Sequence, residues 1–317
     1  MAEVPSEVHR LVDARAAARA AKDFARADEI RDELAAAGWR IVDGSDGRST
    51  VEPVAPVDAS AARAAASGDA LDRTPGYAAS LHWVCEGWPD DIDRAIASFR
   101  RHVGDLAVQY VVADVTGEPR GRWGDDVEVV PSSAEAGWAA ARNAGLHRSL
   151  GEVVVALDGS IEPTGDVVRP LVDALRAPGV GLVGPFGIVT RDLREFEAAA
   201  TAGPCDAIEG YLMAFRREVL IEVGGFDERF RWYRSADIEW SFRVKDAGYR
   251  VEVVDVPVTK HRHRMWDATS PDERDRLSKR NFYRFLDRFR DRWDLVEATR
   301  SPGAGVSRPA SEAPEGA

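Results

Sequence analysis

Short apolar runs alternate with longer amphipathic stretches between residues 78 and 185 of this 317-residue chain. Such alternation is typical of strands and helices in βαβ order, which build a mostly parallel sheet flanked by helices. Runs such as QYVVA and VVVAL are apolar on both faces, as expected of strands buried between two helix layers. Ligands of these sheets lie beyond the carboxyl ends of the strands, so functional residues are expected just after each strand. The expected strands are residues 80–85, 106–114, 152–158 and 180–185, and the expected helices are residues 90–102, 134–150 and 167–178.

A different pattern occupies the beginning of the chain. Residues 6–38 are rich in Ala, Arg, Asp and Glu, which favour helix. Apolar side chains recur there at steps of three and four residues, which predicts two helices packed as a hairpin. The two stripes are Leu11, Ala14 and Ala18 in the first helix and Phe24, Ala27, Ile30 and Leu34 in the second. A strand-like piece with Asp-Gly turn signals follows Gly38.

These patterns divide the chain into a helical hairpin at 1–51, a linker at 52–77, an α/β domain at 78–297 and a tail at 298–317. The linker mixes Pro, Ala, Ser, Gly and Asp without steady periodicity. The tail has almost nothing to bury, so we expect it to be disordered.

The last amphipathic stretch, residues 272–294, has an aromatic stripe on one side. A helix packed on the α/β core is the simplest interpretation, and a helix lying on a membrane surface is the alternative. Eight basic residues are offset by six acidic ones, which favours core packing. The stripe consists of Phe282, Phe285, Leu286, Phe289 and Trp293.

The net charge and the cysteines limit the possible partners and location. A formal net charge of −12 argues against duplex nucleic acid as a partner. The two cysteines, Cys85 and Cys205, lie in apolar surroundings far apart in sequence, which suits buried, reduced thiols. Neither a leader peptide nor an apolar run of about 18 residues is present, so no transmembrane segment is expected. We therefore predict a cytoplasmic protein, with peripheral membrane association left open.

Two acidic residues end expected strands. Asp114 ends QYVVAD and Asp158 ends EVVVALD. In a parallel sheet both carboxylates could face one crevice and bind a nucleobase, a ribose or a divalent cation that neutralises a diphosphate. A strand-terminal Asp can equally cap a helix or hold a turn, so both interpretations stay open at this point.

The N-terminal hairpin resembles the C-terminal end of cysteinyl-tRNA synthetases. The resemblance is carried by KDFARADEIRDELAAAGWRIVDGSDG, which starts at Lys22, and it covers about 45 residues. No synthetase nucleotide-binding motif accompanies it. The hairpin is expected to dock on a neighbouring domain or a partner protein, with RNA contact as the alternative.

The segment 80–266 resembles the family 2 inverting glycosyltransferases. The matching motifs come in the family's order: ARNAGLHRSLGE, LDGSIEP, EGYLMAFRREVLIEVGGFDERF, DIEWSFRVKDAGYRV and HRHRMW. The resemblance implies a GT-A fold and transfer of a sugar from a nucleotide-sugar donor to a hydroxyl acceptor with inversion. The acceptor class, whether saccharide, lipid-linked or small molecule, is left open.

The resemblance also implies a donor site. Asp114 would contact the nucleobase, and Asp158 would occupy the first position of the family's Asp-x-Asp site. Ser160 stands where the family usually has the second acid, which is a departure from the pattern. The donor-binding residues implied by the resemblance are Asp114, Arg142, Asn143, Asp158, Ser160, Glu209 and Gly210.

A divalent cation, Mn²⁺ or Mg²⁺, is the implied cofactor. Its expected ligands are Asp158, His261 and His263, of which His261 is the better match to the family position. One carboxylate is few for a hard cation, which generally takes several oxygen ligands. The alternative is that HRHR, residues 261–264, holds phosphate as a cationic clamp without metal.

The resemblance implies a base among the acids of DIEWSFR. Inverting transfer needs a carboxylate that accepts the proton of the acceptor hydroxyl. Asp237 holds the family position of the base, and Glu239 is the second candidate. A helix N-cap is the alternative, purely structural interpretation of Asp237. Asp227 and Glu228 are expected to organise the acceptor loop. The degenerate metal motif and the unusual strand LHWVCEGW also allow a catalytically impaired binding protein.

Overall fold

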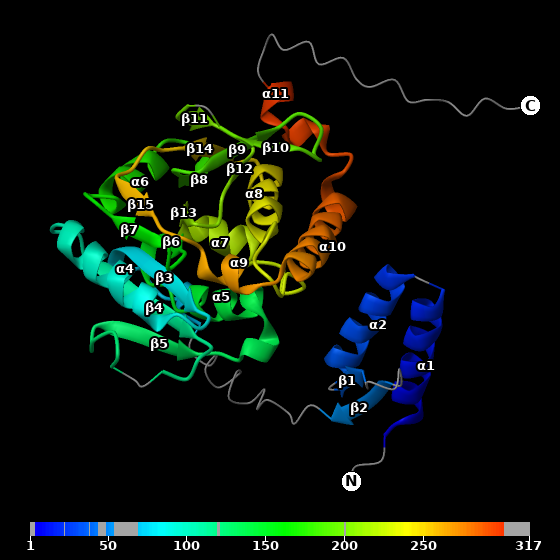
Figure 1. Ribbon diagram of the computed structural model, residues 1–317. Helices are drawn as coiled ribbons and strands as arrows, with labels where there is room; N and C mark the ends of the chain where they lie inside the picture. Colours follow the sequence, from blue (N-terminus) through cyan, green and yellow to red (C-terminus); the bar gives the residue numbers. More distant parts are fainter. Residues whose placement is uncertain are drawn as a thin grey trace, which may run out of the picture. The chain divides into compact units, whose positions relative to one another are not determined.

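The computed structural model describes residues 4–21, 23–37, 39–43, 49–53, 69–118, 121–199 and 201–300. The chain divides into two compact units, Met1–Ser67 and Gly68–Ala317 (Figure 1). Residues 301–317 of the predicted tail and most of the predicted linker lie outside the described residues, whereas residues 298–300 of the predicted tail are helical. The four domain boundaries remain predictions.

The first unit contains the predicted helical hairpin. Helices α1 (Ser6–Ala20) and α2 (Phe24–Ala36) are followed by the antiparallel pair β1 (Trp39–Asp43) and β2 (Ser49–Pro53). Ala27, Ile30 and Leu34 are buried as the second stripe predicted, whereas Ala14 of the first stripe is exposed. A small core therefore forms mainly from α2, completed by the N-terminal half of α1 and by the strand pair.

The second unit is built on one eight-stranded sheet. Its strand order is β11-β14-β8-β13-β6-β3-β4-β5, and β6, β3, β4 and β5 run parallel. The bounds are β3 (Tyr77–Cys85), β4 (Val108–Asp114), β5 (Val127–Pro131), β6 (Gly151–Leu157), β8 (Val180–Gly184), β11 (Gly203–Pro204), β13 (Leu212–Arg216) and β14 (Arg250–Val253).

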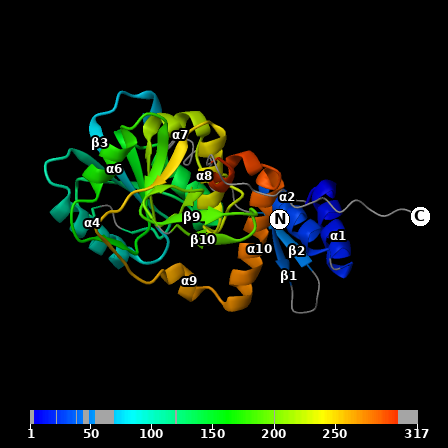
Figure 2. The same cartoon turned by 90° about the horizontal axis from the view of Figure 1, so that it is seen from above.

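Helices cover both faces of this sheet (Figure 2). One face packs Leu81 and Trp83 against side chains such as Phe99 and Leu171, and the other packs Phe215 against side chains such as Trp240. The mostly parallel α/β sheet flanked by helices is therefore confirmed. The helices are α4 (Pro89–His102), α5 (Trp138–Leu146), α6 (Val168–Leu175), α7 (Arg217–Val223), α8 (Ala236–Asp246), α9 (Arg264–Ala268), α10 (Pro271–Phe289) and α11 (Glu297–Arg300), with short 3₁₀ turns η1 (Ala70–Asp72), η2 (Ala134–Ala136) and η3 (Trp293–Leu295).

Two smaller sheets frame the end of the large sheet that carries the site. The strand β9 (Gly187–Thr190) lies between β10 (Phe196–Ala198) and β12 (Ala207–Ile208), and β7 (Ile161–Pro163) pairs with β15 (Val258–Lys260). Because β15 pairs with β7, the segment that follows β15 lies next to the residues that follow β6.

The aromatic stripe of α10 packs on the core, as the sequence predicted. Phe285 and Phe289 are buried against Phe242 of α8, and α10 runs alongside α8 (Figures 1 and 2). Within the described residues, no helix is long and apolar enough to cross a membrane.

The end of the predicted linker packs on the second unit. Arg217 at the start of α7 donates hydrogen bonds to the carbonyl oxygens of Ala70 and Arg73. Ala70 is buried, and its N–H donates to the carbonyl of His147. Residues from about Asp69 onward are therefore held against the α/β unit, which the composition of the segment did not indicate.

Candidate active site

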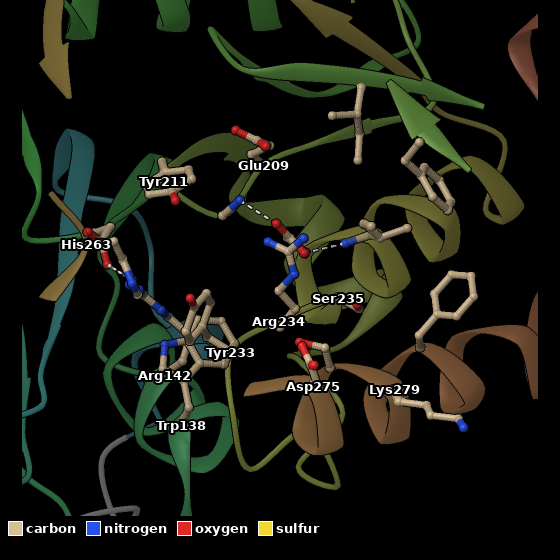
Figure 3. Close-up of a pocket in the computed structure, with 18 of the residues that line it drawn as sticks. Trp138, Arg142, Glu209, Tyr211, Tyr233, Arg234, Ser235, His263, Asp275 and Lys279 are labelled. Carbon is tan, nitrogen blue, oxygen red and sulfur yellow. Dashed lines mark hydrogen bonds and ion pairs between the residues drawn. The ribbon is translucent and has the colours of Figure 1, made fainter. Parts of the chain in front are cut away.

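A cavity of about 600 Å³ lies beyond the carboxyl end of β6 and the amino end of its antiparallel neighbour β13 (Figure 3). Its walls come from the residues after β6, the turn before β13, the loop leading into α8, the segment after β15, and α10. The side chains that carry charge or a ring at this cavity include Arg142, Asp158, Arg194, Glu209, Tyr211, Tyr233, Arg234, Asp237, His263, Asp275, Lys279 and Phe282.

Asp158 is held at one end of the cavity by its own turn and by His263. Its Oδ1 accepts a hydrogen bond from the Ser160 N–H at 2.8 Å, and its Oδ2 lies 3.1 Å from His263 Nε2. Burial raises the pKa of Asp158, but His263 and the hydrogen bonds from Ser160 outweigh it, so the pKa is below its ordinary value. Asp158 is therefore ionised at neutral pH and available to a cation or to donor hydroxyls.

The two candidate histidines point to different acids. His261 Nε2 lies 2.7 Å from Glu162 Oε2, away from Asp158, whereas His263 reaches Asp158 and packs against the rings of Tyr211 and Tyr233. Residues two apart on an extended chain share a face, but the segment turns into α9 at Arg264. The structure thus brings His263 to Asp158, although His261 is the better positional match.

Asp237 lies in the first turn of α8, on the cavity wall. Its Oδ2 accepts a hydrogen bond from the Gly210 N–H at 2.7 Å, and its Oδ1 accepts one from the Ile238 N–H at 2.9 Å. Ser235 occupies the N-cap position of α8, so Asp237 is not the N-cap residue. Burial raises the pKa of Asp237, and the two backbone hydrogen bonds oppose that rise only in part. A carboxylate with a raised pKa is a stronger base than an exposed one.

Glu209 and Gly210 form the turn that faces Asp237. Glu209 pairs with Lys260 at 3.3 Å, and Lys260 in turn lies over the Tyr211 ring. Gly210 supplies the N–H that fixes Asp237. Both residues line the cavity, so the structure groups them with Asp158 and Asp237.

Arg142 and Asn143 take different positions despite being neighbours. Arg142 lines the cavity, donates to the carbonyls of His82 and Leu157, and is buried. Burial lowers its pKa to about 10, while Asp158 and a further acid, Glu86, raise it. Asn143 instead forms two hydrogen bonds of 2.8 Å with the backbone of Phe226. These bonds anchor the loop of residues 224–228, GGFDE.

Asp114 is committed to a turn. Its Oδ1 accepts from the Thr116 N–H and hydroxyl, and its Oδ2 accepts from the Glu118 N–H. It does not line the cavity defined by the described residues. The turn interpretation accounts for both oxygens in this structure, and nucleobase contact by Asp114 stays a prediction.

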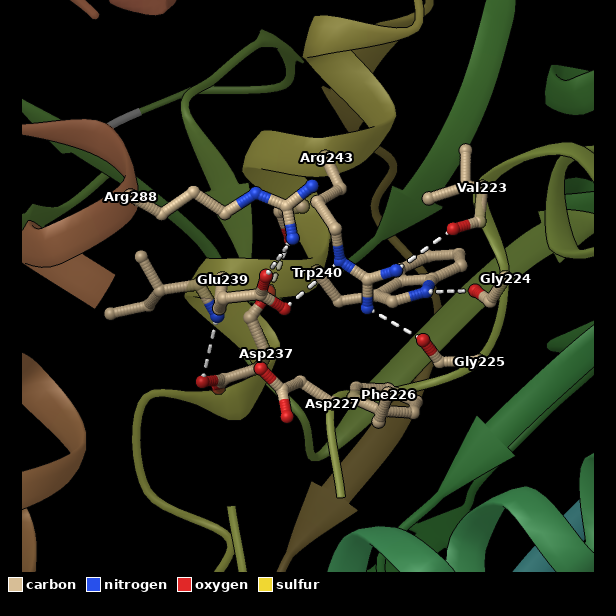
Figure 4. A network of polar contacts seen from close by, with 12 residues as sticks. Val223, Gly224, Gly225, Phe226, Asp227, Asp237, Glu239, Trp240, Arg243 and Arg288 are labelled. Carbon is tan, nitrogen blue, oxygen red and sulfur yellow. Dashed lines mark hydrogen bonds and ion pairs between the residues drawn. The ribbon is translucent and has the colours of Figure 1, made fainter. Parts of the chain in front are cut away.

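Glu239 lies in a buried ionic network between α8 and α10 (Figure 4). Arg243 Nε donates to its Oε2 and Arg288 Nη1 to its Oε1, each at 3.0 Å. Glu239 does not line the cavity. The second candidate for the base is therefore a structural residue, the acid of this ion-pair network. The carboxylate of Asp227 likewise forms an ion pair, with Arg229.

We expect Glu239→Gln to lower the free energy of unfolding by about 2 kcal/mol, because the amide gives up two charge-assisted hydrogen bonds. The loss of stability is limited because Arg243 still donates hydrogen bonds to the carbonyl oxygens of Val223 and Gly225. Urea denaturation measures it. Full retention of stability together with loss of turnover would instead assign Glu239 a chemical role.

Several cavity residues were not predicted from the sequence. Tyr211, Tyr233 and Arg234 are in loops next to predicted site residues. In a loop, position in the sequence does not indicate which side chains face the cavity. Glu86 does not line this cavity but follows β3 directly. Burial raises the pKa of its carboxyl to about 8, with Arg142 opposing and Asp158 adding to the rise. A lone acid in the run LHWVCEGW was the available signal for Glu86.

The second unit has the GT-A fold, with its cavity at the end of the central strands. In solved structures, the chain is similar to GalNAc-T7 crystallised with UDP, GalNAc and Mn²⁺, with a TM-score of 0.55, 18% identity, and coverage of 75% of this chain and 58% of that one. Residues 108–237 match glycosyl transferase family 2. An N-acetylglucosaminyl-diphospho-decaprenol L-rhamnosyltransferase from Mycobacterium tuberculosis is 27% identical over 196 residues, which cover 61% of this chain and 60% of the relative.

The N-terminal unit has separate relatives. Residues 1–48 match the cysteinyl-tRNA ligase anticodon binding domain. A cysteine–tRNA ligase from Opitutus terrae is 58% identical over 52 residues, which cover 16% of this chain and 11% of the ligase. The chain thus spans about a tenth of that ligase and 60% of the rhamnosyltransferase.

Proposed function

We propose that the second unit transfers a sugar from a nucleotide-sugar donor to a hydroxyl acceptor with inversion at the anomeric carbon. Nucleotide-sugar glycosyl transfer is supported by the family 2 match and by the GT-A fold. The rhamnosyltransferase from M. tuberculosis and the UDP held by GalNAc-T7 are consistent with this activity.

One observation carries the proposal: a single cavity has an ionised Asp158 beside His263 at one end and Asp237 on its wall. The first pair suits the diphosphate or ribose of a donor. The second residue is a half-buried carboxylate whose pKa is raised, as a general base requires.

In the proposed step, Asp237 accepts the proton of the acceptor hydroxyl while the hydroxyl oxygen bonds to the anomeric carbon. The bond from that carbon to the diphosphate oxygen breaks, and the nucleoside diphosphate leaves from the opposite face. Arg142 is a buried cation at the donor end and offsets the charge that develops on the leaving group. Asp237 is fixed for this task by the Gly210 N–H.

A divalent cation fits the donor end with help from the donor itself. Asp158 and His263 offer one carboxylate and one imidazole, and no cluster of three or more acidic, His or Cys ligands occurs among the described residues. Mg²⁺ commonly binds through one or two carboxylates plus substrate phosphates and water, so two protein ligands suffice. Bound there, the cation would neutralise the diphosphate.

The raised pKa of Asp237 predicts the pH dependence. A base must be deprotonated, so kcat/KM should fall as pH drops through the folded-state pKa of Asp237, which burial places above the ordinary value. The acid limb is therefore expected above pH of about 4. A pH series of donor turnover measures it. A limb at or below the ordinary aspartate value would remove Asp237 from this role.

The stereochemical outcome tests inversion without knowledge of the acceptor. With water as acceptor, UDP-, GDP- and dTDP-sugars are incubated with the full chain and Mn²⁺, and early proton NMR spectra give the anomer released. An α-linked donor should yield the β-sugar first. Release of the α-sugar would contradict inversion, and nucleotide binding without any turnover would favour the catalytically impaired alternative.

The N-terminal unit has RNA contact as a second candidate function, favoured by its match to an anticodon binding domain. Docking of a partner protein is the alternative. Association with total tRNA is compared between the full chain and a chain lacking residues 1–50. Equal association, or none in either, would exclude RNA contact.

A further inference from the structure

Three cationic side chains line the outer end of the cavity, away from Asp158. Arg194 comes from the turn between β9 and β10, Arg234 from the loop before α8, and Lys279 from α10. Figure 3 shows Lys279 on one side of the cavity and His263 on the other, with Arg234 between them. One cavity is therefore lined by cations from three segments far apart in the sequence.

Within the part of the chain that the structure describes, none of these three side chains donates a hydrogen bond to a carboxylate. Asp192 and Asp237 interact with Arg194 and Arg234 only electrostatically, and the Arg234 guanidinium lies over the Trp266 ring. Elsewhere the acidic chain pairs its cations closely: Glu239 binds two arginines, and Glu209 binds Lys260. Asp275 is the one carboxylate at this end. A local excess of positive charge in a protein of formal net charge −12 indicates a bound anion.

The backbone positions two of these cations at a conformational cost. Leu193 and Ser235 have φ of 60° and 65°, and they are the two non-glycine residues with positive φ in the described ranges. Each adjoins a cavity arginine, Arg194 or Arg234. The left-handed region costs about 1 kcal/mol for such residues, and this kind of strain concentrates at ligand sites.

Hydrogen bonds hold the strained segments in place. Thr190 Oγ1 accepts from the Leu193 N–H at 2.9 Å, and Asp192 Oδ1 accepts from the Arg194 N–H at 2.8 Å. On the other side, Asn281 of α10 is fully buried and donates to the Arg234 carbonyl at 2.9 Å. Both arginines thus project from fixed backbone.

The donor does not account for this charge. Its diphosphate is met at the opposite end by Arg142, His263 and the cation that Asp158 can hold. Asp237 lies on the wall between the two ends, at the place where the acceptor hydroxyl must be. The outer cations therefore face the acceptor, alongside the edge-on rings of Phe196 and Phe282.

We propose that the acceptor carries a phosphate group, which binds Arg194, Arg234 and Lys279 while its hydroxyl lies against Asp237. This rests on the proposed function, which it deepens by naming the acceptor class. Guanidinium and ammonium groups bind phosphate oxygens through charge-assisted hydrogen bonds. Soluble sugar phosphates and phosphate-bearing lipids share this chemistry.

Binding of glucose 1-phosphate and of glucose to the full chain is measured by isothermal titration. Saturating UDP or GDP with Mn²⁺ occupies the donor end, so that the probe phosphate reports on the outer end. Glucose 1-phosphate should bind and glucose should not. Sedimentation with phosphatidic acid vesicles forms the second arm, and binding there identifies a lipid-borne phosphate.

Arg194→Gln and Lys279→Gln should each weaken binding of the phosphate probe about tenfold. Arg191→Gln is the matched control, because Arg191 is exposed in the same turn but does not line the cavity. The control should stay within about twofold of the unmodified chain. Equal weakening by all three variants, or no weakening by the first two, overturns the proposal.

Failure of this proposal is distinguishable from failure of the proposed function. Thermal shifts with UDP and GDP report the donor end and should be unchanged in Arg194→Gln and Lys279→Gln. A chain that binds nucleotide but neither glucose 1-phosphate nor phosphatidic acid vesicles would refute the acceptor class alone. A chain that binds no nucleotide would refute the proposed function.

Discussion

Asp237→Asn is expected to reduce donor turnover about 10²- to 10⁴-fold while leaving nucleotide binding intact and the chain folded. Removing a general base costs about 10² to 10⁴ in rate, and the amide cannot accept a proton at neutral pH. Because burial raises the pKa of Asp237, its charge contributes less to stability in the folded chain than an exposed aspartate would. The missing charge should therefore cost little, but the Asn amide nitrogen cannot accept from one of the two backbone N–H groups, so the free energy of unfolding should fall by about 1 kcal/mol.

The matched control is Asp246→Asn, which changes an exposed carboxylate at the other end of α8. Turnover is followed as nucleoside diphosphate release, and binding as the thermal shift. Turnover within about tenfold of the unmodified chain in Asp237→Asn would assign the base elsewhere. Glu239 would then be no substitute, since both its oxygens bind arginines.

The second large effect is expected at a buried ion pair behind the site. Lys245 and Asp206 are 1% and 0% exposed, and Lys245 Nζ lies 2.9 Å from Asp206 Oδ1. Asp206 also accepts from the Thr190 and Glu297 N–H groups, so it joins β9, α8 and α11. Asp206→Asn leaves the buried ammonium of Lys245 with only Glu297, whose Oε2 lies 3.7 Å away, and should lower the free energy of unfolding by about 3 kcal/mol.

Urea denaturation of three variants tests this expectation. Asp206→Asn combined with Lys245→Met should be less destabilised than the sum of the single changes, because the double variant leaves no unpaired charge. The control is Asp173→Asn, whose partner Arg176 is largely exposed, and it should cost under about 1 kcal/mol. A loss below about 1 kcal/mol in Asp206→Asn would contradict the assigned role.

The sequence predicted the central fold because strand and helix periodicities are local. The expected strands 80–85, 106–114, 152–158 and 180–185 correspond to β3, β4, β6 and β8. It did not predict that β13 inserts antiparallel between β6 and β8, since strand neighbours are set by tertiary packing. The packing of Asp69–Tyr77 on the second unit was missed for the same reason.

The candidate site was predicted in part. Asp158, Gly210 and Asp237 come from separate motifs, and the structure places all three at one cavity. Spacing could not decide between His261 and His263, because the turn into α9 determines which ring reaches Asp158. Residue type likewise could not show that the carboxylate of Glu239 meets arginines instead of the cavity.

The central claim is that the cavity beside Asp158 binds a nucleotide-sugar donor. The most direct test is the melting temperature of the full chain with UDP, GDP, dTDP and their sugars, with and without Mn²⁺, beside Asp158→Asn. At a hundredfold excess over Kd, a ligand of the folded state adds about 2.7 kcal/mol of stability. The account predicts a clear rise for at least one nucleotide that Asp158→Asn diminishes; no rise across the panel, or an equal rise in the variant, would contradict it.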